Sequence, residues 1–269
     1  MAEVVGTLDA LVADIGAGAV LAVPKDYSGV AMAATRALLR RGVRGLHVVG
    51  VPTCGIQVDI LVGAGVVATV ETSAVTLGEC GPAPRFGAAV RAGTVRVLDA
   101  TCPAIHNALL ASEKGLPFIP IRGVIGSDLL AHRADWQVVE NPFRPGDRVV
   151  VLPAIRPDFA LFHAPLADRL GNVWIGRKRE LMTLAHASAA TLVTVEEISD
   201  ANLLDDPVRS PATIPDLYVT RVAAAPRGAA PLGMTGCYAA DGAAIERYAR
   251  MARTAEGFAA FLEEWMAAG

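Results

Sequence analysis

The chain has 269 residues, a formal net charge of −3 at pH 7, and a composition that is 53% hydrophobic but only 5% aromatic. This mild acidity gives no electrostatic indication that the protein binds nucleic acids or membranes. The longest uncharged apolar run, residues 60–70, contains two glycines and is too short to span a bilayer. Four cysteines without a CxxC pair, in a chain without a signal peptide, predict a reduced, cytoplasmic protein.

Apolar strands and amphipathic helices alternate along the chain. Strands are expected at 19–24, 45–51, 66–72, 95–100, 117–122, 149–155, 159–168 and 190–198, and helices at 29–42, 56–65, 84–93, 103–114 and 242–267. This order predicts an α/β fold with an open, mostly parallel sheet and helices on both faces. We expect a single domain over residues 1–269, in which the Pro-rich region 202–215 is a surface loop.

Ligands of such sheets bind beyond the carboxyl ends of the strands, so the loops that follow strands are the places to search. Five loops qualify: 24–29, 51–56, 71–84, 99–106 and 121–130. None of them is a P-loop or a GxGxxG turn, and no two of the five histidines have the spacing of metal ligands on a helix. The sequence therefore predicts no bound metal.

The second and third loops each offer a candidate. Thr53, Cys54 and Gly55 form either a tight turn around a small buried thiol or a substrate contact. Glu79 lies in an apolar stretch rich in Pro and Gly, where a carboxylate can act as a base or cap a backbone N–H group. The residues alone leave both alternatives open.

The fourth loop has the sharpest pattern. Thr101 or Asp99 can cap a helix in whose first turn Pro103 fits. Cys102 then lies at the positive end of the helix dipole, which favours a thiolate, and His106 follows four residues later on the same helix face. Such a pair can form an activated nucleophile. The alternative is a small cysteine that simply packs well, beside a histidine of no catalytic role.

Longer blocks resemble a known family. The stretches "LVGAGVVATVETSAVTLGECGPAPRFGAAVRAG", "LPFIPIRGVIGSDLL", "ALFHAPLADRLGNVWIG" and "ATLVTVEEI" are similar, in order and spacing over about residues 15–265, to the A (alpha) subunit of family I CoA-transferases of the glutaconate type. The most specific pieces are "HAPLADRLGNV", from His163 to Val173, and "TVEEI", from Thr194 to Ile198. The resemblance implies an open α/β/α sheet.

The resemblance also implies a reaction and a partner. Family members move CoA between carboxylic acids through a glutamyl-CoA thioester on the enzyme, and in two-chain members the B (beta) subunit carries that glutamate. This chain would then be inactive without a B subunit, would use acyl-CoA and carboxylic acids as substrates, and would hold no tightly bound cofactor. A CoA-ester-dependent hydrolase on the same fold, or a non-catalytic ligand-sensing or structural subunit, is the alternative.

Two departures from the family pattern bear on the site. The Gly-rich loop GGFG expected after the first strand is replaced by "VPKDYSGVA", in which Gly29 is the one glycine. Cys102 falls where relatives carry Gln or Glu in the active site, so the resemblance implies that it lines the pocket. The candidate site residues are therefore Glu79, Cys102 and His106 for catalysis, with Thr53, Cys54, Gly55 and Ser127 for substrate binding.

Overall fold

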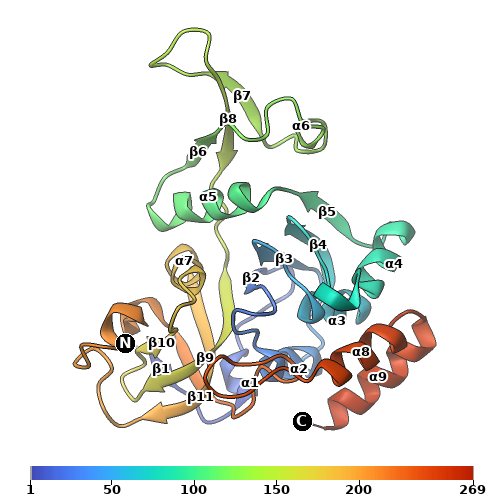
Figure 1. The fold of residues 1–269 in the computed structure, drawn as a ribbon, viewed down its shortest axis with the longest axis vertical. Helices are drawn as coiled ribbons and strands as arrows, with labels where there is room; N and C mark the ends of the chain where they lie inside the picture. The colour runs from blue at the N-terminus through green and yellow to red at the C-terminus, as the bar shows by residue number, and fades with distance from the viewer. Residues whose placement is uncertain (1, 269) are drawn as a thin grey trace.

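The computed structural model describes residues 2–268, and most of its strands form one large sheet (Figure 1). The strand order is β1-β13-β11-β9-β2-β3-β4-β5, and β10 pairs with β9 and β12. Every pairing is parallel except those of β10. The strands span Glu3–Val4 (β1), Val20–Pro24 (β2), Leu46–Val51 (β3), Val67–Thr72 (β4), Arg96–Asp99 (β5), Phe159–Asp168 (β9), Val173–Trp174 (β10), Ala190–Ser199 (β11), Thr213–Ile214 (β12) and Arg221–Ala224 (β13).

Helices cover both faces of this sheet, as the alternation predicts. They span Leu8–Leu11 (α1), Met32–Arg40 (α2), Ile56–Gly63 (α3), Pro84–Ala92 (α4), Cys102–Glu113 (α5), Glu180–Ala187 (α7), Gly242–Met251 (α8) and Ala255–Ala267 (α9). Successive strand residues point to opposite faces: Ala22 and Phe162 pack with α5 and α7, whereas Leu21 and Leu161 pack with α1, α2 and α3. The predicted fold class is confirmed.

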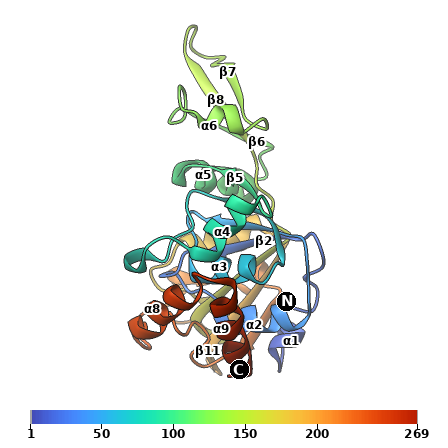
Figure 2. The same cartoon turned by 90° about the vertical axis from the view of Figure 1, so that its right-hand side faces the viewer.

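A smaller sheet projects from the main body between α5 and β9 (Figures 1 and 2). It contains β6 (Phe118–Ile121), β7 (Gln137–Glu140) and β8 (Arg148–Pro153) in the antiparallel order β6-β8-β7, with α6 (Leu129–His132) beside it. The expectation that 117–122 and 149–155 extend the parallel sheet is therefore wrong. Val150 and Leu152 are buried on one face of β8 and pack with Trp136, so this segment buries one face of its own sheet.

Three short 3₁₀ turns complete the described elements: Gly78–Cys80 (η1), Ser210–Ala212 (η2) and Asp216–Tyr218 (η3). The predicted loop 202–215 thus contains η2 and the two residues of β12 rather than irregular chain alone. Across residues 2–268, the longest apolar helices fall short of what a bilayer crossing requires.

Candidate active site

The strands β2, β3, β4 and β5 are neighbours and parallel, so the loops at their carboxyl ends gather at one edge of the sheet. Backbone hydrogen bonds join the second loop to the third: Ser73 N donates to Pro52 O and Cys54 N to Ala74 O, both at 3.0 Å. We call this group of loops, residues 25–29, 52–55, 73–76 and 100–102, the carboxyl edge. Four of the five loops singled out in the sequence therefore meet.

Cys102 is the first residue of α5 and is exposed. The helix forms as predicted, because Thr101 caps it by accepting a hydrogen bond from Ala104 N at 3.3 Å and Pro103 occupies the first turn. The Cys102 sulfur lies 3.1 Å from Ser73 Oγ. Residues from the third and fourth loops are thus in direct contact.

Either atom of the Ser73–Cys102 contact can be the hydrogen-bond donor. A serine hydroxyl has one proton and two lone pairs, and Ser73 Oγ donates to Pro52 O at 2.7 Å. When that proton goes to Pro52, Ser73 Oγ can accept a hydrogen bond from the S–H group of Cys102.

His106 is half-buried on α5. Burial lowers its pKa, with Lys25 acting in the same direction and the nearby charge of Glu180 opposing them. Among residues 2–268 it forms no hydrogen bond with Cys102, so the two side chains that the sequence places on one helix face do not pair here.

Lys25, Ser28 and Glu180 form a polar cluster that the sequence did not reveal. The buried Ser28 hydroxyl donates to Glu180 Oε1 at 2.5 Å, and Lys25 Nζ lies 3.5 Å from the same oxygen. Burial alone would raise the pKa of Glu180, but these partners lower it, so the carboxylate is charged. Lys25 and Ser28 lie in the loop that replaces the Gly-rich motif, whereas Glu180, at the start of α7, belongs to no motif.

Within the carboxyl edge, Cys54 and Gly55 are buried and Thr53 is half-buried. Burial raises the pKa of the Cys54 thiol to about 12, so this cysteine stays neutral, in agreement with the structural alternative for it. A Cβ atom on Gly55 would clash with the carboxyl group of Asp26, so the absence of a side chain there admits Asp26.

Asp26 is a second residue of the site without a signal in the sequence. Its Oδ2 accepts a hydrogen bond from Ile56 N, in the first turn of α3, at 3.2 Å, whereas its buried Oδ1 has no partner among the described residues. Burial raises its pKa to about 6, and the neighbouring Asp59 adds to the shift. A carboxyl group that titrates near neutral pH therefore lies beneath the second loop.

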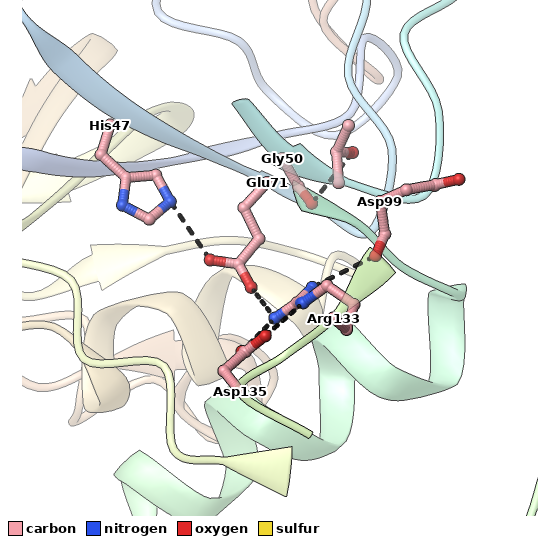
Figure 3. A network of polar contacts seen from close by, with 7 residues as sticks. His47, Gly50, Glu71, Asp99, Arg133 and Asp135 are labelled. Atoms are coloured by element: carbon pink, nitrogen blue, oxygen red, sulfur yellow. Dashed lines mark hydrogen bonds and ion pairs between the residues drawn. The ribbon is translucent and has the colours of Figure 1, made fainter. Parts of the chain in front are cut away.

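A buried ionic network holds the projecting sheet against this edge (Figure 3). Arg133, just after α6, donates to Glu71 Oε1 at 2.7 Å, to both oxygens of Asp135 and to the carbonyl oxygen of Asp99. His47 Nε2 lies 3.1 Å from the other oxygen of Glu71, without hydrogen-bond geometry. Glu71 and Asp99 belong to the ends of β4 and β5, just before Ser73 and Cys102.

Two predicted site residues lie elsewhere. Glu79 is exposed in η1 and lines a cleft of about 510 Å³ against α8, together with Tyr27, Arg250 and Arg253. Ser127 is exposed in the projecting segment, between β6 and α6. Within the described part of the chain, neither side chain bonds to the Ser73–Cys102 pair, and their roles remain predictions.

The two most specific sequence blocks meet through the pairing of β9 with β11, which places Thr194 beside His163. The buried His163 ring contacts Thr194 Oγ1 at 2.8 Å and Glu196 Oε1 at 2.6 Å, and Tyr238 donates to the same Glu196 oxygen at 2.7 Å. A Cβ atom on Gly29 would clash with the His163 carbonyl oxygen, so glycine is required there. Both ring nitrogens of His163 have hydrogen-bond partners, which indicates that this residue has a structural role.

Comparisons with known proteins agree with this fold. The model of the family "Coenzyme A transferase" matches residues 5–225. The A (alpha) chain of glutaconate CoA-transferase from Acidaminococcus fermentans is 32% identical over 87% of this chain and 78% of its own length. The crystal structure of glutaconate coenzyme A-transferase from that organism superposes with a TM-score of 0.93, covering 98% of this chain and 89% of the matched one.

Two further relatives are similar along almost the whole chain. The A (alpha) chain of 3-oxoadipate CoA-transferase from Pseudomonas knackmussii is 30% identical over 99% of this chain and 94% of its own length. A chain of the decarboxylase AibA/AibB is 32% identical, with a TM-score of 0.85 over 98% of this chain and 100% of the matched one. The sequence resemblance is thereby confirmed, and the chain belongs to the coenzyme A transferase family.

Proposed function

We propose that this chain is the A (alpha) subunit of a heteromeric CoA-transferase, which moves CoA from an acyl-CoA thioester to a carboxylic acid once a B subunit supplies the nucleophilic glutamate. Its place in the cell would be the cytoplasm, and CoA would be a substrate rather than a tightly held cofactor. The four cysteines, all free thiols, are consistent with a reducing compartment.

One observation carries this proposal: the carboxyl groups around the carboxyl edge are either bonded to neighbouring groups or buried. Glu71 is paired with Arg133, and Glu180 with Lys25 and Ser28. The Asp26 carboxyl group lies beneath the second loop with Oδ1 buried, and Asp99 Oδ1 accepts the N–H group of Ala100. A nucleophilic carboxylate must be exposed and free to attack a thioester, so the edge is suited to receive one from another chain.

The test is to co-purify this chain with the B-type chain encoded beside it. The complex should exchange CoA between an acyl-CoA and an added acid, and mass spectrometry should find CoA esterified to a glutamate of the partner. The chain alone should be inactive. A lone, monodisperse chain that turns over acyl-CoA would contradict the proposal.

A second candidate is cleavage of a C–C bond in a CoA ester. The similarity to the AibA/AibB decarboxylase, which extends over that whole chain, favours it, and the missing Gly-rich loop is a departure in the substrate-binding region. Release of CO₂ or of a hydrolysed acid by the complex, without any acceptor acid, would select this candidate over transfer.

A further inference from the structure

The first loop of the carboxyl edge, residues 25–29, is held in place on both sides of Asp26. Ser28 N donates to Lys25 O at 2.9 Å, which closes a turn around Asp26. The side chains of Lys25 and Ser28 both contact Glu180 at the start of α7. The loop therefore presents the Asp26 side chain from a defined position.

The second loop of the carboxyl edge is joined to the third loop through its backbone. Cys54 N donates to Ala74 O, and Cys54 O accepts a hydrogen bond from Thr76 N, both at 3.0 Å. The residue just before this pairing is Ser73, which contacts Cys102 at 3.1 Å. A displacement of the second loop would therefore also displace the Ser73–Cys102 contact.

Asp26 joins the first loop to the second. Its Oδ2 accepts a hydrogen bond at 3.2 Å from Ile56 N, the first N–H group of α3, and its carboxyl group fills the space that a Cβ atom would need at Gly55. Gly55 is the N-cap residue of α3 and has no side chain with which to cap the helix. Asp26 thus caps α3 from another loop, where a carboxyl group is favoured by the helix dipole.

We infer that Asp26 is a positioning residue of the candidate active site, which holds the second loop, and through it the third loop, in the arrangement that receives the substrate. The inference rests on the proposed function for the reaction that this arrangement serves. The residue belongs to the loop that replaces the Gly-rich motif, so this chain uses a side chain to join the two loops.

Burial makes this contact sensitive to pH. It raises the pKa of Asp26 from the ordinary value of 3.8 to about 6, and the buried Oδ1 has no partner among residues 2–268. Opening of the second loop exposes the carboxyl group to water, where its pKa returns to the ordinary value. Because the closed loop favours the neutral form, the loop should open more readily as pH rises from about 4 to 6, with the full effect above that range.

Three titratable groups interact with Asp26 from the surrounding structure: Asp59 of α3, Cys54 of the second loop and Tyr248 of α8. Burial raises the pKa of the Cys54 thiol and of the Tyr248 hydroxyl, so both stay neutral between pH 4 and pH 7. Burial also raises the pKa of Asp59, although its hydrogen bond with Tyr248 and the charge of Arg85 on α4 oppose that shift. The experiment must therefore separate Asp26 from Asp59.

Hydrogen exchange measures the opening of the second loop apart from turnover. Mass spectrometry follows residues 53–58 in the co-purified complex, with rates corrected for the intrinsic effect of pH. Exchange in the wild type should accelerate at least about tenfold between pH 4 and pH 7, and by no more than about a hundredfold, because the two pKa values differ by about two. Asp26→Asn keeps an oxygen for Ile56 N without the charge, so its exchange should not respond to pH. Asp26→Ala should exchange at least about tenfold faster than Asp26→Asn at every pH.

Turnover tests whether this loop position matters to the site. Asp26→Ala should lower kcat of the complex at least about tenfold, and Asp26→Asn should restore it. Gly55→Ala forces the carboxyl group out of its place and should resemble Asp26→Ala, while the double variant should be no worse than either single variant. The matched control Thr254→Ala removes the cap of α9, whose partner is Gly257 N, and should alter neither exchange of the second loop nor kcat.

The outcomes separate this inference from the proposed function. Equal exchange in wild type and Asp26→Ala would overturn the inference, and so would a pH response that persists in Asp26→Asn, which would assign the response to Asp59. If Asp26→Ala does not fold, the comparison of wild type with Asp26→Asn across pH still decides. The expected exchange pattern in a complex without CoA transfer would support the role of Asp26 in holding the loops and contradict the proposed function. CoA transfer at the wild-type rate in Asp26→Ala would support the function and overturn the positioning role.

Discussion

Arg133 and Glu71 form a buried ion pair, 2.7 Å between Nη2 and Oε1, with 3% and 6% of their side chains exposed. The pair joins the projecting sheet to the end of β4, and the Arg133 bond to the Asp99 carbonyl adds the end of β5 (Figure 3). Ser73 and Cys102 follow these two anchor points by two and three residues, so Arg133 holds their loops at a fixed separation.

Replacing Arg133 should therefore be costly. Arg133→Met keeps most of the length of the side chain but leaves Glu71 buried without its partner, and we expect a loss of about 3–5 kcal/mol in the free energy of unfolding. The control Asp135→Asn changes a partner that is 42% exposed and should cost less than about 1 kcal/mol. Denaturant unfolding, followed by circular dichroism, measures both.

The double variant Arg133→Met/Glu71→Gln isolates the pair itself. Because the second change removes the stranded carboxylate, the double variant should be less destabilised than the sum of the two single variants. Strictly additive losses in the free energy of unfolding would show that the two side chains act independently. This outcome would contradict the ion pair between Arg133 and Glu71.

Asp26 gives a pH-dependent prediction. Its folded-state pKa of about 6 lies above the ordinary value of 3.8, so the folded state holds this proton more tightly than the unfolded state does. The wild type should therefore lose stability as pH rises from about 4 to 6, and the penalty is fully present above that range. The free energy of unfolding of Asp26→Asn, measured relative to that of the wild type, should rise by about 2–3 kcal/mol between pH 4 and pH 7.

The comparison for Asp26 is an exposed carboxyl group. Asp128 caps no backbone group with its side chain, so Asp128→Asn is the control for replacing an exposed carboxyl group by an amide. Urea unfolding at several pH values measures both variants. A gap between Asp26→Asn and wild type that does not change with pH would mean that folding leaves the pKa of Asp26 unchanged.

The parallel sheet is predictable from the sequence because its strands are solid apolar runs separated by capped helices, and the predicted cap of α5 at Thr101 is present in the structure. The strands β6 and β8 are misassigned because a run such as "VVVLP" fits a parallel or an antiparallel strand equally well. The site is predicted less completely. Asp26, Glu180 and Arg133 carry no local motif, and their importance depends on residues far away in the chain: Gly55, Ser28 and Glu71.

Glu79 keeps its predicted role until it is tested. If this exposed carboxylate serves catalysis or the subunit interface, Glu79→Gln should lower the turnover of the complex by more than about tenfold, or roughly 1.4 kcal/mol of barrier, with unchanged melting. Glu246→Gln, on the α8 wall of the same cleft, is the matched control and should retain activity. A parallel fall in melting temperature would identify Glu79 as a structural cap.

The contact between Cys102 and Ser73 leads to the last prediction. If Cys102 only lines the pocket, a serine hydroxyl at position 102 can replace the thiol in this contact, and Cys102→Ser should keep most of the activity of the complex. Iodoacetamide should still inactivate the wild type, because alkylation of the exposed Cys102 sulfur places a bulky group at the carboxyl edge. The same reagent should leave Cys102→Ser active.

A catalytic thiolate gives the opposite pattern: serine would abolish turnover, since a hydroxyl is a far weaker nucleophile at neutral pH. Labelling would then be rapid below about pH 7 and would slow markedly in His106→Asn. Activity and labelling of wild type, Cys102→Ser and His106→Asn, followed together across pH, decide between a side chain that lines the pocket and one that attacks the substrate.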